Sequence, residues 1–183
     1  MEEFKDMKVF AMDQDVEAEE WFKKEFSEFS ESKRIHLVRD NFVNFEKYLN
    51  EWKEFSGENN WDFILLDLGV SSPQLDDPHR GFSFYHDGPL DMRMDTSAKF
   101  SAADIVNHWE EKELSDLFYN FGEIKFPNKV VRGILERRKK KPFSRTLELS
   151  EFIEQLCGWK KKGKHPATQY FLALRIVVNS ELE

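Results

Sequence analysis

Residues 65–82 read LLDLGVSSPQLDDPHRGF, and they are the most informative part of this chain. An apolar run ends in the carboxylate of Asp67, and a turn rich in Gly, Ser and Pro follows it directly. This order is typical of a buried parallel strand that places an acid at the carboxyl edge of an α/β sheet, where ligands bind. The loop continues as far as Lys99, and loops of this length in compact domains usually carry function.

The residues before this stretch alternate between two hydrophobic patterns. Short apolar runs predict strands at 8–12, 35–38 and 61–66, whereas apolar residues at helical spacing predict helices at 17–29 and 43–55. Parallel strands joined through helices need crossover connections, so this order predicts a parallel sheet. The fold class that we expect is therefore α/β.

After the loop, the pattern is wholly helical. Periodic apolar residues predict helices at 101–106, 110–121, 127–138, 146–156 and 166–182. We expect three parts in the chain: an α/β core with the long loop at 1–100, an inserted all-helical module at 101–165, and a last helix at 166–183 that returns to the core.

The composition is that of a soluble globular protein. Of 183 residues 40% are hydrophobic, and 18 Phe can build a core, but no apolar run approaches the roughly 20 residues that span a bilayer. The acidic start MEEFKD is unlike a signal peptide. Cys157 is the single cysteine, and the 5 His form no pairs with acids at ligand spacing, so we expect neither disulfides nor a metal site. A cytoplasmic location without membrane association is the default expectation.

Positive charge is concentrated in one part of the chain. The net charge is −8, yet residues 125–164 hold 13 Lys and Arg against 4 Asp and Glu, which leaves 14 of the 27 basic and 31 of the 35 acidic residues for the rest. This asymmetry suits either an electropositive nucleic-acid surface or ordinary solvated helix faces. The cations that we expect to contact phosphates are Arg137, Arg138, Lys139, Lys140, Lys141, Lys160, Lys161, Lys162 and Lys164.

Two acids and one aromatic residue follow the predicted strands. Asp13 could accept hydrogen bonds from both hydroxyls of a nucleotide ribose, or it could cap the next helix. Asp67 precedes Gly69 and two serines, whose small size lets a ligand approach the backbone, but it could also satisfy local amides. Phe42 could pack on an adenine face or belong to the core.

Further motifs join residues 65–82 in a pattern that covers nearly the whole chain. They are 87–95 (DGPLDMRMD), 101–104 (SAAD), 121–123 (FGE), 165–168 (HPAT), 173–176 (ALRI) and 178–182 (VNSEL). This pattern closely resembles the RsmH (MraW) family, enzymes that use S-adenosyl-L-methionine to methylate the N4 amino group of a cytidine in 16S, small-subunit ribosomal RNA. The resemblance implies a class I, Rossmann-like methyltransferase sheet, and the small ribosomal subunit or its RNA as partner; it leaves a homodimer open.

The resemblance also implies roles for individual residues. Asp13 matches the acid that holds the cofactor ribose, Phe42 matches the residue beside the adenine, and Asp67 and Gln74 match the remaining cofactor contacts in this part of the chain. The helical module would face the RNA.

The residue that activates the amine is not identified by the pattern. The candidates are Asp91 and Arg93 in the long loop. They could orient the base edge or a phosphate, or they could pair with each other and fix the loop.

The sequence also departs from the family pattern. Family members carry a strand and a loop of the type Gly-x-Gly-Gly-His before the first strand predicted here, and a Phe-His-Ser-Leu-Glu segment downstream, and neither occurs in this sequence. The missing strand would pair with both strands that end at Asp13 and Asp67, so several backbone groups would lose partners. We therefore expect an internal fragment of a methyltransferase, whose own activity is in question. The alternative is a non-catalytic RNA-binding helical module with a vestigial α/β part.

Overall fold

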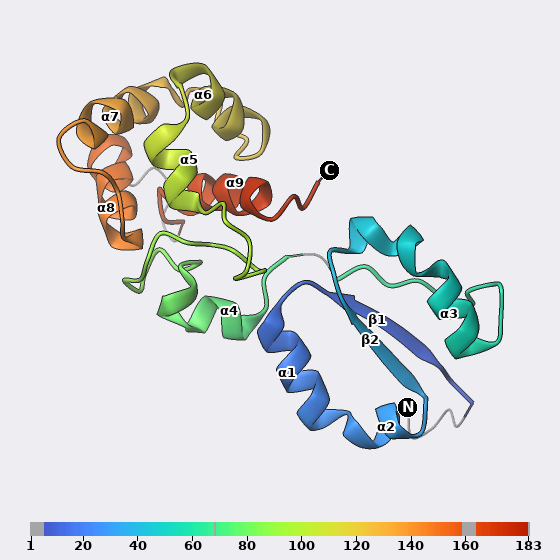
Figure 1. Cartoon of the computed structure of the whole chain (residues 1–183). Coiled ribbons are helices and arrows are strands. Elements are labelled where there is room, and N and C mark those ends of the chain that lie inside the picture. Colours follow the sequence, from blue (N-terminus) through green and yellow to red (C-terminus); the bar gives the residue numbers. More distant parts are fainter. Residues whose placement is uncertain (1–5, 68, 159–163, 183) are drawn as a thin grey trace. The chain divides into compact units, whose positions relative to one another are not determined.

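The computed structural model describes residues 6–67, 69–158 and 164–182, which form two compact units (Figure 1). The first unit holds the described residues up to Asp67 together with Met94–Thr96. The second unit holds the described residues from Gly69 to Arg93 and from Ser97 onward. The predicted α/β class is confirmed, because the first unit carries a parallel sheet with helices and the second is helical.

The first unit is built around a small parallel sheet. Its two described strands pair from Val9 with Ile35 to Asp13 with Arg39, so that both strands end at the same edge of the sheet. The elements are β1 (Val9–Asp13), α1 (Val16–Glu25), α2 (Ser27–Glu31), β2 (Ile35–Arg39), the 3₁₀ helix η1 (Phe42–Tyr48) and α3 (Leu49–Ser56).

The two helical regions of this unit differ from prediction in local detail. The helix predicted at 17–29 is interrupted at Phe26, whose φ and ψ of −116° and 20° leave the helical region. The helix predicted at 43–55 begins as a 3₁₀ helix, capped by the side chain of Asn41, which accepts the N–H of Val43. The tighter 3₁₀ turn is common at the start of an α-helix.

Aromatic rings bind α3 to the sheet. The ring of Phe10 in β1 lies edge-on to Trp52 and Trp61, with centroid separations of 6.0 and 6.2 Å. Trp52 and Trp61 stack on each other with their centroids 3.8 Å apart, and Trp52 is buried. This cluster fixes the start of the segment that was predicted as the third strand.

That third strand is the clearest error of the sequence-based prediction. The segment at 62–66 forms no strand, and the side chains of Phe63, Ile64, Leu65 and Leu66 are between 62% and 76% exposed. A strand needs a neighbour to accept and donate its backbone hydrogen bonds. Among the described residues no strand lies beside this segment, so its apolar side chains are not buried.

The second unit is helical. Its elements are α4 (Ser72–Asp76), the 3₁₀ helix η2 (Pro78–Arg80), α5 (Ala102–His108), α6 (Glu111–Asn120), α7 (Asn128–Arg138), α8 (Thr146–Cys157) and α9 (Thr168–Val178). The helix α9 packs against α5 and α6, while α7 packs against α5, α6 and α8 (Figure 1). The five helices predicted after the loop are confirmed, and the domain boundaries predicted at residues 100 and 165 stay a prediction.

The long loop is bound tightly into the second unit. Its Leu90 and Met92 are buried among the helices. Gly88 exchanges two hydrogen bonds with Thr146: its N–H donates to the Thr146 hydroxyl at 3.0 Å, and its carbonyl accepts the Thr146 N–H at 2.9 Å. A Cβ atom on Gly88 would lie 1.7 Å from the carbonyl oxygen of Pro78, so only glycine fits where these two segments meet. The loop therefore presents its polar residues from a fixed backbone.

Candidate functional site: strand ends and a basic helical surface

The carboxylate of Asp13 stands at the carboxyl end of β1. Its Oδ1 accepts the N–H of Asp15 at 2.8 Å, and Asp15 in turn caps α1 by accepting the N–H of Glu17 at 3.0 Å. The backbone N–H of Gln14 is a second hydrogen-bond donor to this carboxylate. Partial burial and the nearby charge of Asp15 raise the pKa of Asp13. The backbone thus orients this carboxylate at the end of the strand.

Polar side chains join the ends of the two strands. The Gln14 side-chain oxygen, just after β1, accepts a hydrogen bond of 3.3 Å from the Asn41 amide, just after β2. The Gln14 amide also donates to the sulfur of Met94 at 3.2 Å. Sequence reasoning missed this pair, although both residues lie within three residues of the end of a predicted strand.

Asp40, at the end of β2, is a further acid that sequence reasoning did not single out. Its carboxylate accepts hydrogen bonds from the Asn41 N–H at 2.7 Å, the Asn44 amide at 2.8 Å and the Tyr48 hydroxyl at 2.8 Å. Burial opposes ionisation, but these hydrogen bonds outweigh it and lower the pKa of Asp40. Asp40 therefore anchors η1 and is not a free ligand group.

Phe42 is the first residue of η1, two residues beyond Asp40. Its side chain is half-buried, and no other aromatic ring of the described residues stacks on it. Its role beside the adenine stays a prediction.

Asp67 and Gln74 belong to different units of the chain. Asp67 is exposed and follows the unpaired segment 62–66, so no third strand places it beside Asp13. Gln74 belongs to the second unit, where it is buried and its side-chain oxygen accepts the Ser71 N–H at 2.9 Å. This bond and the Ser71 side chain form a capping box at the start of α4. Cofactor contacts by these two residues stay predictions.

Asp91 and Arg93 are paired with each other. The guanidinium donates to both carboxylate oxygens, with Nε–Oδ1 at 2.8 Å and Nη2–Oδ2 at 2.7 Å, and the Arg93 N–H also donates to Oδ1. A further guanidinium N–H bonds the carbonyl of Ala98. This is the loop-fixing arrangement that the sequence left open. Both side chains are 24% exposed, so the pair can also be reached from outside.

The basic residues divide into structural and free groups. The Arg138 guanidinium donates to the carbonyls of Val106 and Trp109 at the end of α5. Arg137 lies over the ring of Phe143, 3.8 Å from its centroid, and Lys141 pairs with Glu148. Of the predicted phosphate contacts, Lys139, Lys140 and Lys164 are exposed and form no ion pair among the described residues. The predicted contacts Lys160, Lys161 and Lys162 lie outside the described residues.

The described residues offer neither a metal site nor a membrane-spanning helix. No three His, Cys, Asp or Glu side chains gather where they could hold a metal ion. Of the described helices, none combines the length and apolar character that crossing a bilayer requires.

Comparison with known proteins assigns the chain to a family. The model of the MraW methylase family matches residues 1–183. The protein named ribosomal RNA small subunit methyltransferase H of Bdellovibrio bacteriovorus is 46% identical over 177 residues, which are 97% of this chain and 52% of that protein. Its namesake of Carboxydothermus hydrogenoformans is 46% identical over 178 residues, 97% of this chain and 55% of that protein. The Legionella pneumophila protein of this name is 42% identical over 175 residues, 96% of this chain and 55% of that protein.

The matches cover nearly all of this chain, but the chain spans about half the length of the curated relatives. The family also accounts for the parallel strands, because its members have a Rossmann-like methyltransferase fold. On this evidence, the chain belongs to the MraW methylase family.

Proposed function

We propose that this chain forms part of an S-adenosyl-L-methionine-dependent methyltransferase that modifies the N4 amino group of a cytidine in small-subunit ribosomal RNA. The family match and the name of the relatives support the reaction class and the RNA. The proposed substrate implies a cytoplasmic location.

The observation that carries the proposal is the carboxylate of Asp13. It is held at the carboxyl end of β1 by the Asp15 N–H. An ionised carboxylate only accepts hydrogen bonds, and it therefore suits the two ribose hydroxyls of the cofactor. The half-buried Phe42 follows the neighbouring strand and would lie against the adenine. Asp67 and Gln74 would complete the contacts, as the family resemblance implies.

The cofactor supplies a methyl group that is already activated on a sulfonium. The N4 amine of cytosine is a weak nucleophile because its lone pair is delocalised into the ring. The protein therefore contributes mainly by alignment, which supplies up to about 7–11 kcal/mol in favourable intramolecular reactions. The target base must leave its stack to be aligned. Asp91 and Arg93, on their fixed loop, are the candidates that would orient the base edge or a phosphate.

The helical unit would hold the RNA. Its exposed Lys139, Lys140 and Lys164 offer phosphate contacts, and Lys160, Lys161 and Lys162 are expected to add to them. Such contacts position RNA without reading its sequence. RNA affinity should therefore fall steeply as salt is raised.

A chimera tests the proposal directly. This chain would replace the 177 matching residues of the Bdellovibrio bacteriovorus protein, which would supply the remaining part. We expect the chimera to form N4-methylcytidine in small ribosomal subunits that lack the modification, measured by mass spectrometry of the digested RNA. We expect Asp13→Asn to abolish this activity and Glu17→Gln, on the exposed start of α1, to leave it unchanged. A folded chimera without activity, or full activity of Asp13→Asn, would refute the proposal.

The non-catalytic alternative has one observation in its favour, because the helical unit has a core of its own. The two functions differ in their dependence on the cofactor. If RNA binding by the chimera is strong but no methyl group is transferred with or without S-adenosyl-L-methionine, the alternative is correct.

A further inference from the structure

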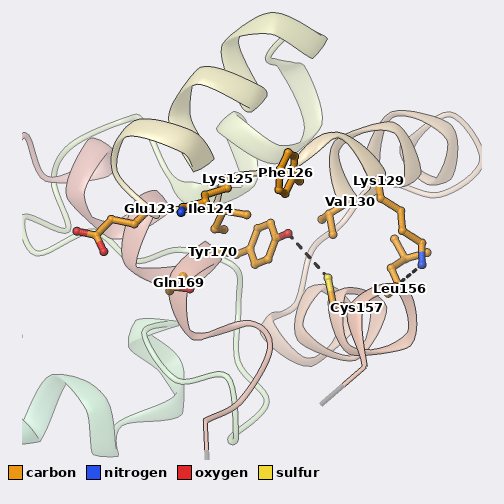
Figure 2. Close-up of a pocket in the computed structure, with 10 residues that line it drawn as sticks. All are labelled: Glu123, Ile124, Lys125, Phe126, Lys129, Val130, Leu156, Cys157, Gln169 and Tyr170. Carbon is orange, nitrogen blue, oxygen red and sulfur yellow. Dashed lines mark hydrogen bonds between the residues drawn. The ribbon is translucent and has the colours of Figure 1, made fainter. Parts of the chain in front are cut away.

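A cleft in the second unit is lined by none of the residues proposed above to contact the cofactor or the RNA. Its volume is about 370 Å³. The segment between α6 and α7, the first residues of α7, the end of α8 and the start of α9 line it (Figure 2). The lining residues that matter below are Glu123, Lys125, Phe126, Lys129, Gln169 and Tyr170.

Phe126 is the most conspicuous of these side chains. It is 88% exposed, more than any other large apolar residue that the structure describes. Single exposed apolar side chains are ordinary on protein surfaces. A planar ring at the border of a cleft, however, is the kind of group on which nucleic-acid bases stack.

Two cations accompany this ring. Lys125 precedes it in the chain, is exposed and has no ion-pair partner among the described residues. The ammonium of Lys129 donates to the carbonyl of Leu156 at the end of α8. An ammonium carries three N–H groups, so two remain for an anion. The only acid that lines the cleft within the described residues is Glu123, and its carboxylate points away from the ring of Tyr170 (Figure 2).

Tyr170 lies at the centre of the cleft (Figure 2). It is 5% exposed, and its hydroxyl lies 3.9 Å from the sulfur of Cys157. Burial raises the pKa of Tyr170, so the hydroxyl remains protonated. Beside it, Gln169 offers an amide that can both donate and accept. The cleft thus combines aromatic, hydrogen-bonding and cationic groups.

We propose that this cleft binds one unpaired nucleobase of RNA, stacked on Phe126, with an adjacent phosphate held by Lys125 and Lys129. The inference rests on the proposed function, which makes RNA the substrate. The charge asymmetry supports a polyanion, since residues 125–164 carry 13 basic and 4 acidic residues. The base must be unpaired because the faces of paired bases are covered by their neighbours in the stack.

The test compares single-stranded and duplex RNA. Binding of a fluorescein-labelled, unstructured RNA decamer to the full chain would be measured by anisotropy, with its duplex as the second ligand. We expect Phe126→Ala to weaken binding of the single strand about fivefold or more, and Phe126→Trp to restore it. Tyr119→Ala is the matched control, because Tyr119 is 59% exposed on α6 and lies outside the cleft. This control and duplex binding by Phe126→Ala should be unchanged.

Salt dependence tests the two lysines. Joint replacement of Lys125 and Lys129 by Ala should lower the magnitude of the slope of log affinity against log salt by about 0.7, because the two lysines hold one phosphate and each single-strand phosphate contact contributes about 0.7. Equal effects of Phe126→Ala and Tyr119→Ala, loss of duplex binding by Phe126→Ala, or no binding of the single strand by the folded chain would overturn the inference. None of these results touches the proposed function, which fails only if the folded chimera with Phe126 intact transfers no methyl group or if Asp13→Asn remains fully active.

Discussion

The side-chain amide of Asn179 donates a hydrogen bond of 2.8 Å to the backbone carbonyl of Met92. It thereby joins the end of α9 to the long loop, 87 residues earlier in the chain. The same amide donates to the carbonyl of Arg175 at 2.9 Å, and Asn179 is buried. Met92 is fully buried with a φ of 65°, a conformation that is unfavourable for a residue with a side chain. The contact with Asn179 therefore helps to fix the part of the loop that carries Asp91 and Arg93.

Replacing this amide should destabilise the second unit. We expect Asn179→Ala to lower the free energy of unfolding by about 1–3 kcal/mol, because it leaves the buried Met92 carbonyl without this donor. Urea denaturation followed by circular dichroism measures the change. Asn120→Ala, at the exposed end of α6, is the control and should stay within about 0.5 kcal/mol of the parent. Equal effects of the two variants would contradict the role assigned to Asn179.

Glu148 in α8 makes stability depend on pH. The hydrogen bond from Lys141 and the Ser144 N–H at 3.0 Å lower the pKa of Glu148 from 4.5 to about 2, with a smaller contribution from Arg137. Because the pKa is lower in the folded state, the ionised carboxylate stabilises the fold above about pH 4.5. This stabilisation is lost as the pH falls toward 2.

We expect Glu148→Gln to cost about 1–2 kcal/mol at pH 7, less than the pKa shift alone implies, since Lys141 is 70% exposed and solvent screens the pair. The cost should shrink between pH 5 and pH 2, which urea denaturation across this range measures. Glu151→Gln, on an exposed position of the same helix, serves as control and should show no such trend. A pH-independent cost of Glu148→Gln would show that its charge is not responsible.

Ionisation of Asp13 should have the opposite effect on stability from ionisation of Glu148. Its pKa is raised by burial and by Asp15, so ionisation of Asp13 lowers the stability of the fold. The stability that protonation provides is present below the usual pKa of 3.8 and is lost as the pH rises through the higher pKa of the folded state. Asp13→Asn keeps an oxygen for the Asp15 N–H, and it should therefore be as stable as the parent or more stable at pH 7. Denaturation at pH 4 and pH 7 tests this; a clear loss of stability at pH 7 would make the carboxylate structural.

The sequence was sufficient to predict the elements that depend mainly on local residues. Helical spacing located α5 to α9, and the apolar runs located β1 and β2. It failed at residues 62–66, because an apolar run shows that burial is favourable but not whether a neighbouring strand exists. A strand is a relation between two segments, and one segment alone cannot specify it.

The candidate site likewise combines residues that the sequence predicts with contacts that it does not predict. The carboxylate of Asp13 was predicted from its place after a strand, but its contact with Asp15 and the pairing of Gln14 with Asn41 depend on how the two strand ends meet. Gln74 is different, since Ser71 and Gln74 have the spacing of a capping box. That signal was present in the sequence and predicts a structural role for this side chain.

The exposed segment at 63–66 should make the chain prone to association. Leu65 and Phe63 are both 76% exposed in an extended run without a described partner strand, and such runs pair with other chains. We expect Leu65→Lys to reduce aggregation, measured by light scattering at increasing concentration, while the free energy of unfolding stays within about 0.5 kcal/mol. Val43→Lys, also at an exposed apolar position but within η1, should have a smaller effect on aggregation. Unchanged scattering of Leu65→Lys would exclude this segment as the cause.

The pairing of Asp91 with Arg93 predicts that the two residues act as a unit. If their bidentate contact fixes the loop, removing either partner removes the same interaction. Asp91→Ala, Arg93→Ala and the double variant should then lower stability by similar amounts, with a coupling energy of about 1 kcal/mol in a double-mutant cycle. Arg93→Lys should not restore it, because an ammonium cannot reproduce the two parallel hydrogen bonds.

Methylation by the chimera separates this structural role from a role toward the RNA. A group that contacts the base or a phosphate lowers the rate beyond what the loss of folded protein explains. We therefore expect the Arg93 variants to reduce the methylation rate per folded molecule more than Glu148→Gln does, at matched loss of stability. Unchanged methylation per folded molecule in both Asp91→Ala and Arg93→Ala would show that the pair only fixes the loop. The backbone of the turn at 71–73 would then be the next candidate for the group that activates the amine.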